Sequence, residues 1–132
     1  MPTPVKLPKP TDGELAILAA LWEIGPATVR QIHHHLDRDT AYTTVLKLLQ
    51  IMTDKGLVRR IDSPPPARSH IYAAAQPAQA TQRRLLSDLV DKAFAGSAAN
   101  LVLQALAAKR ASPDELAQIK KLLDDFQQGE AQ

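Results

Sequence analysis

Hydrophobic residues recur at helical spacing through the first part of the chain. Thr11 precedes the run and Glu14 stands three positions later, the spacing of a capping box, in which two side chains satisfy backbone N–H groups at a helix start. The pattern ends at Gly25-Pro26, because proline cannot continue a helix. These signals predict an amphipathic helix whose apolar face is formed by Leu15, Ile17, Leu18, Leu21, Trp22 and Ile24.

Two further helices are predicted directly behind the first. Thr28 and Gln31 repeat the capping-box spacing before a short helix with apolar positions at Val29, Ile32 and Leu36. A longer helix follows a few polar residues later and ends at Gly56, a residue suited to a left-handed C-cap. Its apolar positions, expected to face the core, are Val45, Leu48, Leu49 and Met52. Because so few residues separate these two helices, they predict a helix-turn-helix.

The segments "LVRRI" and "SHIYAAA" contain good strand residues and flank Pro64, Pro65 and Pro66. Proline has no backbone N–H, so these three residues are excluded from a helix interior or a paired central strand and predict an exposed turn. Two strands around such a turn, directly after a helix-turn-helix, predict a winged helix with Arg68 at the wing tip. An ordinary hairpin connection is the alternative reading of this turn.

Beyond Gln76 the chain is helical again. The breaks fall at Gly96-Ser97 and before "SPDEL", which supplies an N-cap, a proline at the first helical position and acidic residues in the first turn. The exposed aliphatics of these short helices predict pairing with a second copy of the chain through a two-fold interface. Packing back onto the first part of the same chain is the alternative. The apolar positions include Leu85, Leu86, Leu89, Val90, Phe94, Ile119, Leu122, Leu123 and Phe126.

Composition narrows the class of protein. A length of 132 residues, 45% hydrophobic and 23% charged, suits one core or one small domain plus an oligomerisation segment. There is no cysteine, which excludes disulfides and thiolate chemistry, and no apolar run is long enough to cross a bilayer or serve as a signal peptide. No nucleophile elbow, phosphate loop or zinc-protease motif is present. We therefore expect a cytoplasmic, non-enzymatic protein without a cofactor.

Positive charge is concentrated in the first part of the chain. Residues 1–75 carry nine Lys or Arg against seven Asp or Glu, which accounts for the whole net charge of +2. The excess is densest between Arg38 and His70. A nucleic-acid surface and an ordinary solvated face are both compatible with this excess.

Three consecutive histidines, His33, His34 and His35, suggest a metal site at first sight. On a helix their side chains diverge by about 100° per residue, so they cannot all reach one ion. His33 and Asp37 have a usable spacing but no evident third ligand. We therefore expect no metal site.

The stretches "LWEIGPATVRQI" and "AYTTVLKLLQIMTDKGLVRR", followed by a predicted wing ending in "IY", carry a family resemblance. The chain resembles the penicillinase-repressor and methicillin-resistance-repressor family of winged-helix regulators, from about Leu15 to Tyr72 and more weakly beyond. The resemblance implies a homodimeric repressor on a palindromic operator in double-stranded DNA. It implies a mainly α fold with a winged-helix DNA-binding domain and two-stranded wing over residues 11–75 and a helical dimerisation domain over 76–132. The prolines among residues 1–10 predict a flexible N-terminal arm.

DNA contacts are expected at the start of the third predicted helix, because a recognition helix inserts its N-terminal residues into the major groove. We assign Thr43 and Lys47 mainly to bases, and Tyr42 and Thr44 to bases or phosphate. Arg30 and Arg68 are assigned to phosphate or the minor groove.

The sequence departs from the family pattern at several positions. Ile51 and Asp54 stand where the family commonly has basic residues, and Leu48 stands where threonine is usual. The third helix is therefore less cationic, which predicts weaker phosphate contacts and a flatter salt dependence. A winged-helix protein-interaction module without sequence-specific DNA binding is the alternative function.

Resembling repressors are induced by a regulatory protease that cleaves the dimerisation domain, and the corresponding bond here lies near Gln104-Ala105. The asparagine–aromatic pair at that bond in the antibiotic-resistance repressors is missing. Its absence disfavours cleavage by such a receptor protease. The cysteine cluster of copper-responsive relatives is missing as well.

Overall fold

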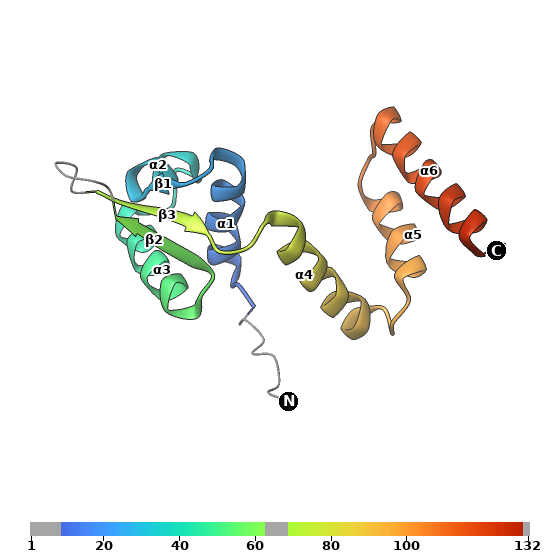
Figure 1. The fold of residues 1–132 in the computed structure, drawn as a ribbon, viewed down its shortest axis with the longest axis horizontal. Coiled ribbons are helices and arrows are strands. Elements are labelled where there is room, and N and C mark those ends of the chain that lie inside the picture. The colour runs from blue at the N-terminus through green and yellow to red at the C-terminus, as the bar shows by residue number, and fades with distance from the viewer. Residues whose placement is uncertain (1–8, 63–68, 131–132) are drawn as a thin grey trace. The chain divides into compact units, whose positions relative to one another are not determined.

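The computed structural model describes residues 9–62 and 69–130. Pro64, Pro65, Pro66 and Arg68, the predicted wing tip, lie outside the described residues, as does most of the predicted arm. The chain divides into two compact units, Met1–Leu86 and Ser87–Gln132. The elements, in chain order, are α1 (Asp12–Ile24), β1 (Ala27–Thr28), α2 (Val29–His35), α3 (Tyr42–Lys55), β2 (Val58–Asp62), β3 (His70–Ala74), α4 (Ala78–Ala93), α5 (Ala98–Ala108) and α6 (Pro113–Glu130) (Figure 1).

The helix ends follow the capping signals of the sequence. At α1 the Thr11 N–H donates to Glu14 Oε1 at 2.8 Å, and the Glu14 N–H donates to Thr11 Oγ1 at 3.3 Å. Thr28 and Gln31 form the same reciprocal pair at α2. Gly56 ends α3 in the left-handed region, with φ 81° and ψ 15°, where a side chain would be strained. The capping predictions are confirmed.

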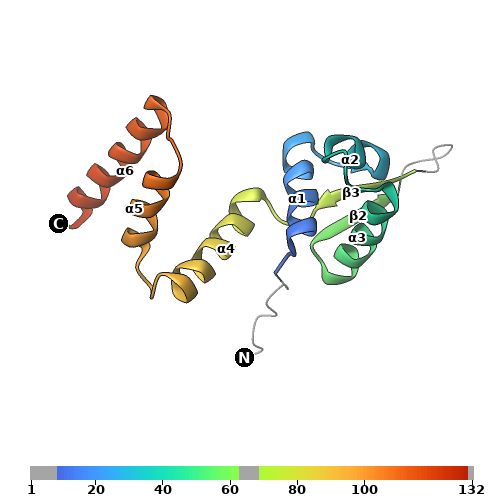
Figure 2. The ribbon, with the colours of Figure 1, turned by 180° about the vertical axis from the view of Figure 1, so that it is seen from behind.

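The core of the first unit lies where α1, α2 and α3 meet the sheet (Figure 2). The first helix buries Ile17, Leu18 and Leu21, whereas Trp22 is only half-buried and Ile24 is exposed. The helix-turn-helix and the hairpin complete the core with Ile32, Val45, Leu49, Met52, Val58 and Tyr72. Leu48 and Leu36 pack against this core while remaining partly exposed.

The wing is part of a three-stranded antiparallel sheet in the order β1-β3-β2. The two strands predicted around the prolines pair from Val58 with Ala74 to Asp62 with His70. The short strand β1 adds the pairs of Ala27 with Tyr72 and Thr28 with Ile71. The sequence did not predict this third strand, because two residues are too short to show the alternation of a strand.

A partly buried ion pair joins α1 to α3. The Glu14 side chain is almost completely buried, and Lys55 Nζ lies 2.9 Å from Oε1 and 3.0 Å from Oε2. Lys55 is the last residue of α3, so the contact fixes the end of α3 against the start of α1. Burial alone would raise the pKa of Glu14, but the hydrogen bonds from Thr11 and Lys55 and the Lys55 charge outweigh it and lower that pKa.

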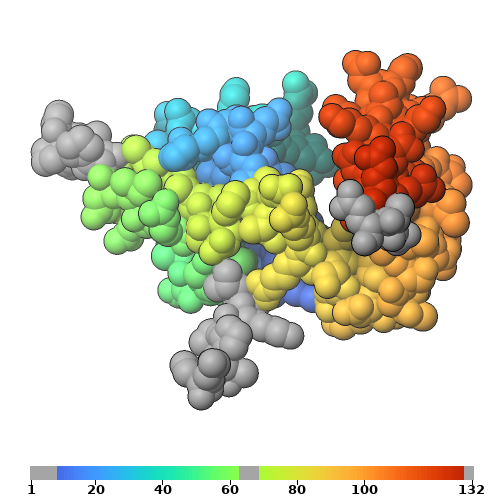
Figure 3. All heavy atoms as spheres, turned by 45° about the vertical axis from the view of Figure 1, so that its right-hand side comes forward, coloured from blue at the N-terminus to red at the C-terminus, as the bar shows by residue number. Residues whose placement is uncertain are grey.

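The second unit consists of the end of α4 with α5 and α6. Ala95 and Gly96, with φ 52° and 82°, turn the chain after α4, and Ser97 caps α5. Ser112 and Glu115 cap α6 by reciprocal hydrogen bonds. Side by side in Figures 1 and 2, α5 and α6 expose most of their side chains (orange to red in Figure 3). Among the described residues, no helix is long and apolar enough to cross a membrane.

Candidate nucleic-acid interface

The third helix has one buried side and one polar, exposed side. Val45, Leu49 and Met52 are completely buried and anchor α3 to the core. Thr43 and Lys47 lie on the opposite side, and all four polar residues of the first two turns, Tyr42, Thr43, Thr44 and Lys47, are exposed. The helix thus presents two hydroxyl groups, a phenol and an ammonium group without disturbing its packing.

A polar hollow of about 500 Å³ lies beside the start of α3. Arg30 from α2, Tyr42 from α3 and His70 from β3 line it together. The structure therefore brings two predicted DNA-contacting residues, Arg30 and Tyr42, to one concave surface next to His70, at the turn end of the hairpin. Thr43, Thr44 and Lys47 follow on the same helix but do not line this hollow.

The turn that leads into α3 is held by His33. Its Nε2 lies 2.8 Å from the Thr40 carbonyl oxygen, so this nitrogen carries the proton and donates it. The His33 ring also meets the Tyr42 ring edge-on, with centroids 5.7 Å apart and planes at 87°. One side chain of α2 therefore fixes both the turn and the first residue of α3. Sequence reasoning treated His33 as helix surface, because seven positions separate it from Thr40 and no local pattern links them.

The end of the hairpin nearest the turn carries mixed charge. Asp62 Oδ1 lies 3.3 Å from His70 Nδ1 and 3.8 Å from Arg60 Nε. His70 was also not among the residues predicted to contact DNA. Its pairing opposite Asp62 on the neighbouring strand was the available signal, but it required the strand register.

The three residues of α3 that differ from the family pattern are not equally exposed. Ile51 and Asp54 are exposed on α3, so neither is explained by burial in the core. Leu48 instead packs partly against the core and cannot serve as a polar contact.

The histidines do not converge on an ion. His35 Nε2 lies 2.9 Å from Glu23 Oε2, while His33 is bonded to the Thr40 carbonyl. Within residues 9–62 and 69–130 there is no group of three or more His, Cys, Asp or Glu side chains that could hold a metal.

Residues 10–125 match the Penicillinase repressor family, which spans the helix-turn-helix, the sheet and most of the C-terminal helices. The chain belongs to the penicillinase-repressor family. Transcriptional regulator BlaI of Mycobacterium tuberculosis, in strains CDC 1551 / Oshkosh and H37Rv, is 32% identical over 127 residues, covering 94% of this chain and 89% of that protein.

Solved structures place this penicillinase-repressor family member among winged-helix regulators. A MarR family transcription regulator superimposes with a TM-score of 0.54 and 25% identity, over 92% of this chain and 72% of that one. Transcriptional regulator Tm0710 from Thermotoga maritima gives 0.52 and 16% identity, over 92% and 80%. The family and the fold together make the chain a winged-helix transcriptional regulator.

Proposed function

We propose that the chain is a homodimeric transcriptional repressor that binds a two-fold symmetric operator through α3. The observation that carries this proposal is the polar N-terminal part of α3, where Tyr42, Thr43, Thr44 and Lys47 are exposed while Val45, Leu49 and Met52 are fixed in the core. A rigid helix with short polar side chains at its N-terminal end suits the major groove.

The proposed contacts divide into two kinds. Thr43 and Lys47 lie one helical turn apart and reach base edges, which carry sequence information. Arg30 and Tyr42 line the hollow beside α3, which suits a backbone phosphate because phosphate contacts fix the register of a protein on the duplex. Arg68, outside the described residues, keeps its sequence-based assignment to phosphate or the minor groove.

The dimer is proposed from the second unit. Large apolar side chains there are strongly exposed, with Leu103 69% and Phe126 63% accessible, beside Leu106, Leu116, Leu122 and Leu123. An apolar surface of this kind is typical of a protein interface rather than of a monomer. A two-fold dimer would cover it with the same surface of a second copy and would match a palindromic operator.

The bond at which resembling repressors are cleaved corresponds to a position near Gln104-Ala105. Gln104 and Ala105 both lie inside α5, and Gln104 Nε2 donates to Asn100 Oδ1 at 3.0 Å. The bond that the resemblance points to is therefore in regular helix.

The test is a mobility shift of the full chain against DNA from its own promoter region, with scrambled DNA as control and salt as a second variable. We expect tighter binding to the promoter DNA and an affinity that falls with salt, because cations on the protein displace counterions from phosphate. Equal affinity for promoter and scrambled DNA at every salt concentration would contradict the operator.

A protein-interaction module is the second candidate, and exposed Ile51 and Asp54 on α3 favour it. An apolar and an acidic side chain on that helix suit a protein surface better than phosphate. Ile51→Lys and Asp54→Lys distinguish the two functions. Both changes should strengthen binding to any DNA if α3 enters the groove, and should leave DNA binding absent if α3 docks only to a protein.

A further inference from the structure

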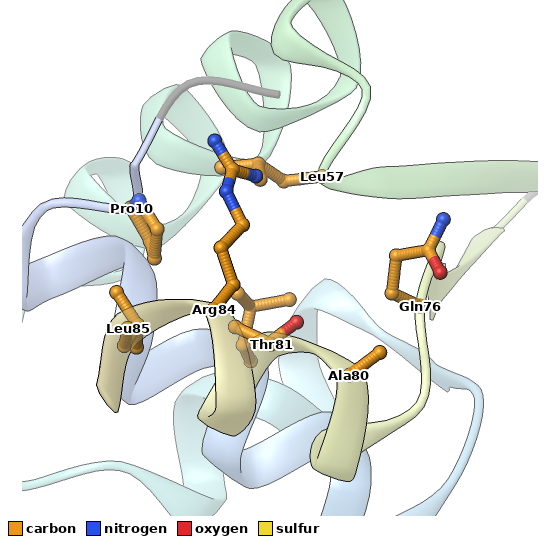
Figure 4. A pocket seen from close by; sticks show the side chains of 8 residues that line it. Pro10, Leu57, Gln76, Ala80, Thr81, Arg84 and Leu85 are labelled. Carbon is orange, nitrogen blue, oxygen red and sulfur yellow. The ribbon is translucent and has the colours of Figure 1, made fainter. Parts of the chain in front are cut away.

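A partly open cavity of about 150 Å³ lies in the first unit, beside the first two turns of α4 (Figure 4). Leu18 of α1 and Leu57, just before β2, form its inner wall, and both are buried in the core. Pro10 and Leu85 close it from the side of the N-terminal segment and of α4. The walls come from segments far apart in the sequence, so the shape of the cavity depends on the folded unit.

The size and lining of the cavity suit one small apolar group. A void of roughly this volume with aliphatic walls is large enough to hold a benzene-sized molecule. Leu18 and Leu57 cannot move away without opening the core, because buried side chains are closely packed. The inner part of the cavity therefore selects a compact ring or a short branched aliphatic group.

The outer part of the cavity carries a positive charge. Arg84 extends from α4 toward Leu57, so that its guanidinium group stands over the apolar wall (Figure 4). Among the residues that the structure describes, this guanidinium has no hydrogen bond and no ion pair. Thr81 and Gln76 also line the cavity and add a hydroxyl group and an amide. A planar guanidinium group is suited to a carboxylate, which it can bind through two parallel hydrogen bonds.

We infer that this cavity is a binding site for a small organic anion, a carboxylate with a ring-sized apolar body. The apolar body fills the space against Leu18 and Leu57, and the carboxylate pairs with Arg84. Neither part suffices alone: the cavity is too small for a large hydrophobic ligand, and a half-buried arginine in water binds simple anions weakly.

Occupancy of the cavity bears on the rest of the molecule through α4. This helix forms one wall with Ala80, Thr81, Arg84 and Leu85 and runs on to Ala93 in the second unit. The segment before it is tied to α1 by the Trp22 indole N–H, which donates to the Gln76 carbonyl oxygen at 3.2 Å. A ligand between α4 and the core would change the direction in which α4 leaves the first unit. This consequence rests on the proposed DNA-binding dimer, in which that direction sets the spacing of the two recognition helices.

The binding test uses benzoate as the probe and the isosteric, uncharged benzamide as its control. Full-length wild-type protein, Arg84→Gln and Arg83→Gln are titrated by calorimetry and by amide chemical shifts. Arg83 is the adjacent, exposed arginine of α4 outside the cavity, so its variant removes the same charge without touching the site. Ala80→Leu, which fills the cavity from α4, is the steric variant. Trp22, the single tryptophan, gives a fluorescence signal next to Gln76.

We expect saturable millimolar binding of benzoate to wild type and Arg83→Gln, with shifts at Thr81 and Arg84. Binding should weaken at least about tenfold in Arg84→Gln and in Ala80→Leu, because a charge-assisted contact or the space itself is lost. Benzamide should bind to wild type at least as weakly as benzoate binds to Arg84→Gln. An absence of saturation in wild type, equal affinity in Arg84→Gln, or equal weakening in both arginine variants would overturn the site.

The link to DNA is tested separately. Benzoate at saturation should change the affinity for promoter DNA severalfold in wild type but not in Arg84→Gln. If the protein binds benzoate as expected but binds no DNA, the proposed function fails and the anion site stands. Binding of both ligands without mutual effect would overturn the coupling through α4.

Discussion

At the residue scale, the exposed side chains of α3 allow contacts to bases to be distinguished from contacts to phosphate. Thr43 and Lys47 are exposed one turn apart, with Val45 and Leu49 holding the helix from the other side. A side chain that meets a base edge contributes to one sequence only, whereas one that meets phosphate contributes to all sequences.

Thr43→Ala and Lys47→Ala are therefore expected to reduce discrimination between promoter and scrambled DNA, each by about 1–3 kcal/mol where a good base contact is lost. Arg30→Ala should instead weaken binding to both DNAs equally and lower the salt slope by about one unit. Mobility shifts over a range of salt concentrations measure both effects. Equal losses on both DNAs for Thr43→Ala and Lys47→Ala would reassign these residues to phosphate.

Glu14 contributes to the stability of the fold, independently of DNA binding. Its lowered pKa in the folded protein means that, as pH falls, the unfolded chain takes up the proton first. The stability that the carboxylate contributes is therefore complete above the ordinary glutamate pKa of about 4.3. It is lost as pH falls through the lower pKa of the folded protein.

Glu14→Gln should lower the free energy of unfolding near neutral pH by about 1–3 kcal/mol, because the Lys55 ammonium loses its charged partner. The difference from wild type should shrink as pH falls from the ordinary pKa of a glutamate toward the lower folded value, because the wild-type carboxyl group is then protonated too. Urea unfolding at a series of pH values measures this. Asp114→Asn is the matched control, since Asp114 is an exposed carboxylate in the first turn of α6. A pH profile that Glu14→Gln leaves unchanged would contradict the role of the ion pair.

At the element scale, the position of α3 depends on the turn that precedes it. No side chain caps the N-terminus of α3, because its N-cap residue is Ala41. The hydrogen bond from His33 to the Thr40 carbonyl and the ring contact with Tyr42 take over the task of fixing this end. The recognition helix is thus positioned by the helix before it.

His33→Ala should lower DNA affinity severalfold with an unchanged salt slope, since no phosphate contact is removed while the start of α3 gains freedom. His34→Ala, at the exposed neighbouring position, should have no effect. Mobility shifts on both variants, with circular dichroism to confirm the fold, test this. A loss of affinity that is equal in the two variants would exclude a specific role for His33.

The elements could be predicted from the sequence wherever the signals are local. Thr11 with Glu14, Thr28 with Gln31 and the glycine at 56 are visible within a few residues, and the structure confirms each of them. The contacts of Glu14 with Lys55 and of Trp22 with Gln76 span 41 and 54 positions and could not be predicted. The polar hollow and the cavity beside α4 depend on such distant contacts. The sequence could therefore predict individual DNA-contacting residues, but not the surface that they form together.

At the scale of the whole molecule, the two units differ in how many of their large apolar side chains are exposed. The first unit buries many of its large aliphatics in one core, while the second exposes most of its own along α5 and α6. Burial of apolar area at about 25 cal/mol per Å² makes a second copy the natural cover for that surface. The predicted boundary at residue 76 stays a prediction, because the first half of α4 is grouped with the first unit.

The last prediction concerns this assembly. The full chain should be a dimer at micromolar concentration, and Leu103→Asp with Phe126→Asp should make it a monomer, because two charges would be buried unpaired in the interface. Gln128→Asp, an exposed polar position on α6, is the control and should remain dimeric. Light scattering after gel filtration measures the mass. The monomeric variant should keep its folded first unit yet bind a palindromic site much more weakly than wild type, since the second recognition helix is no longer held nearby. A wild-type monomer would refute the dimer, and a dimer that survives both aspartates would move the interface away from α5 and α6.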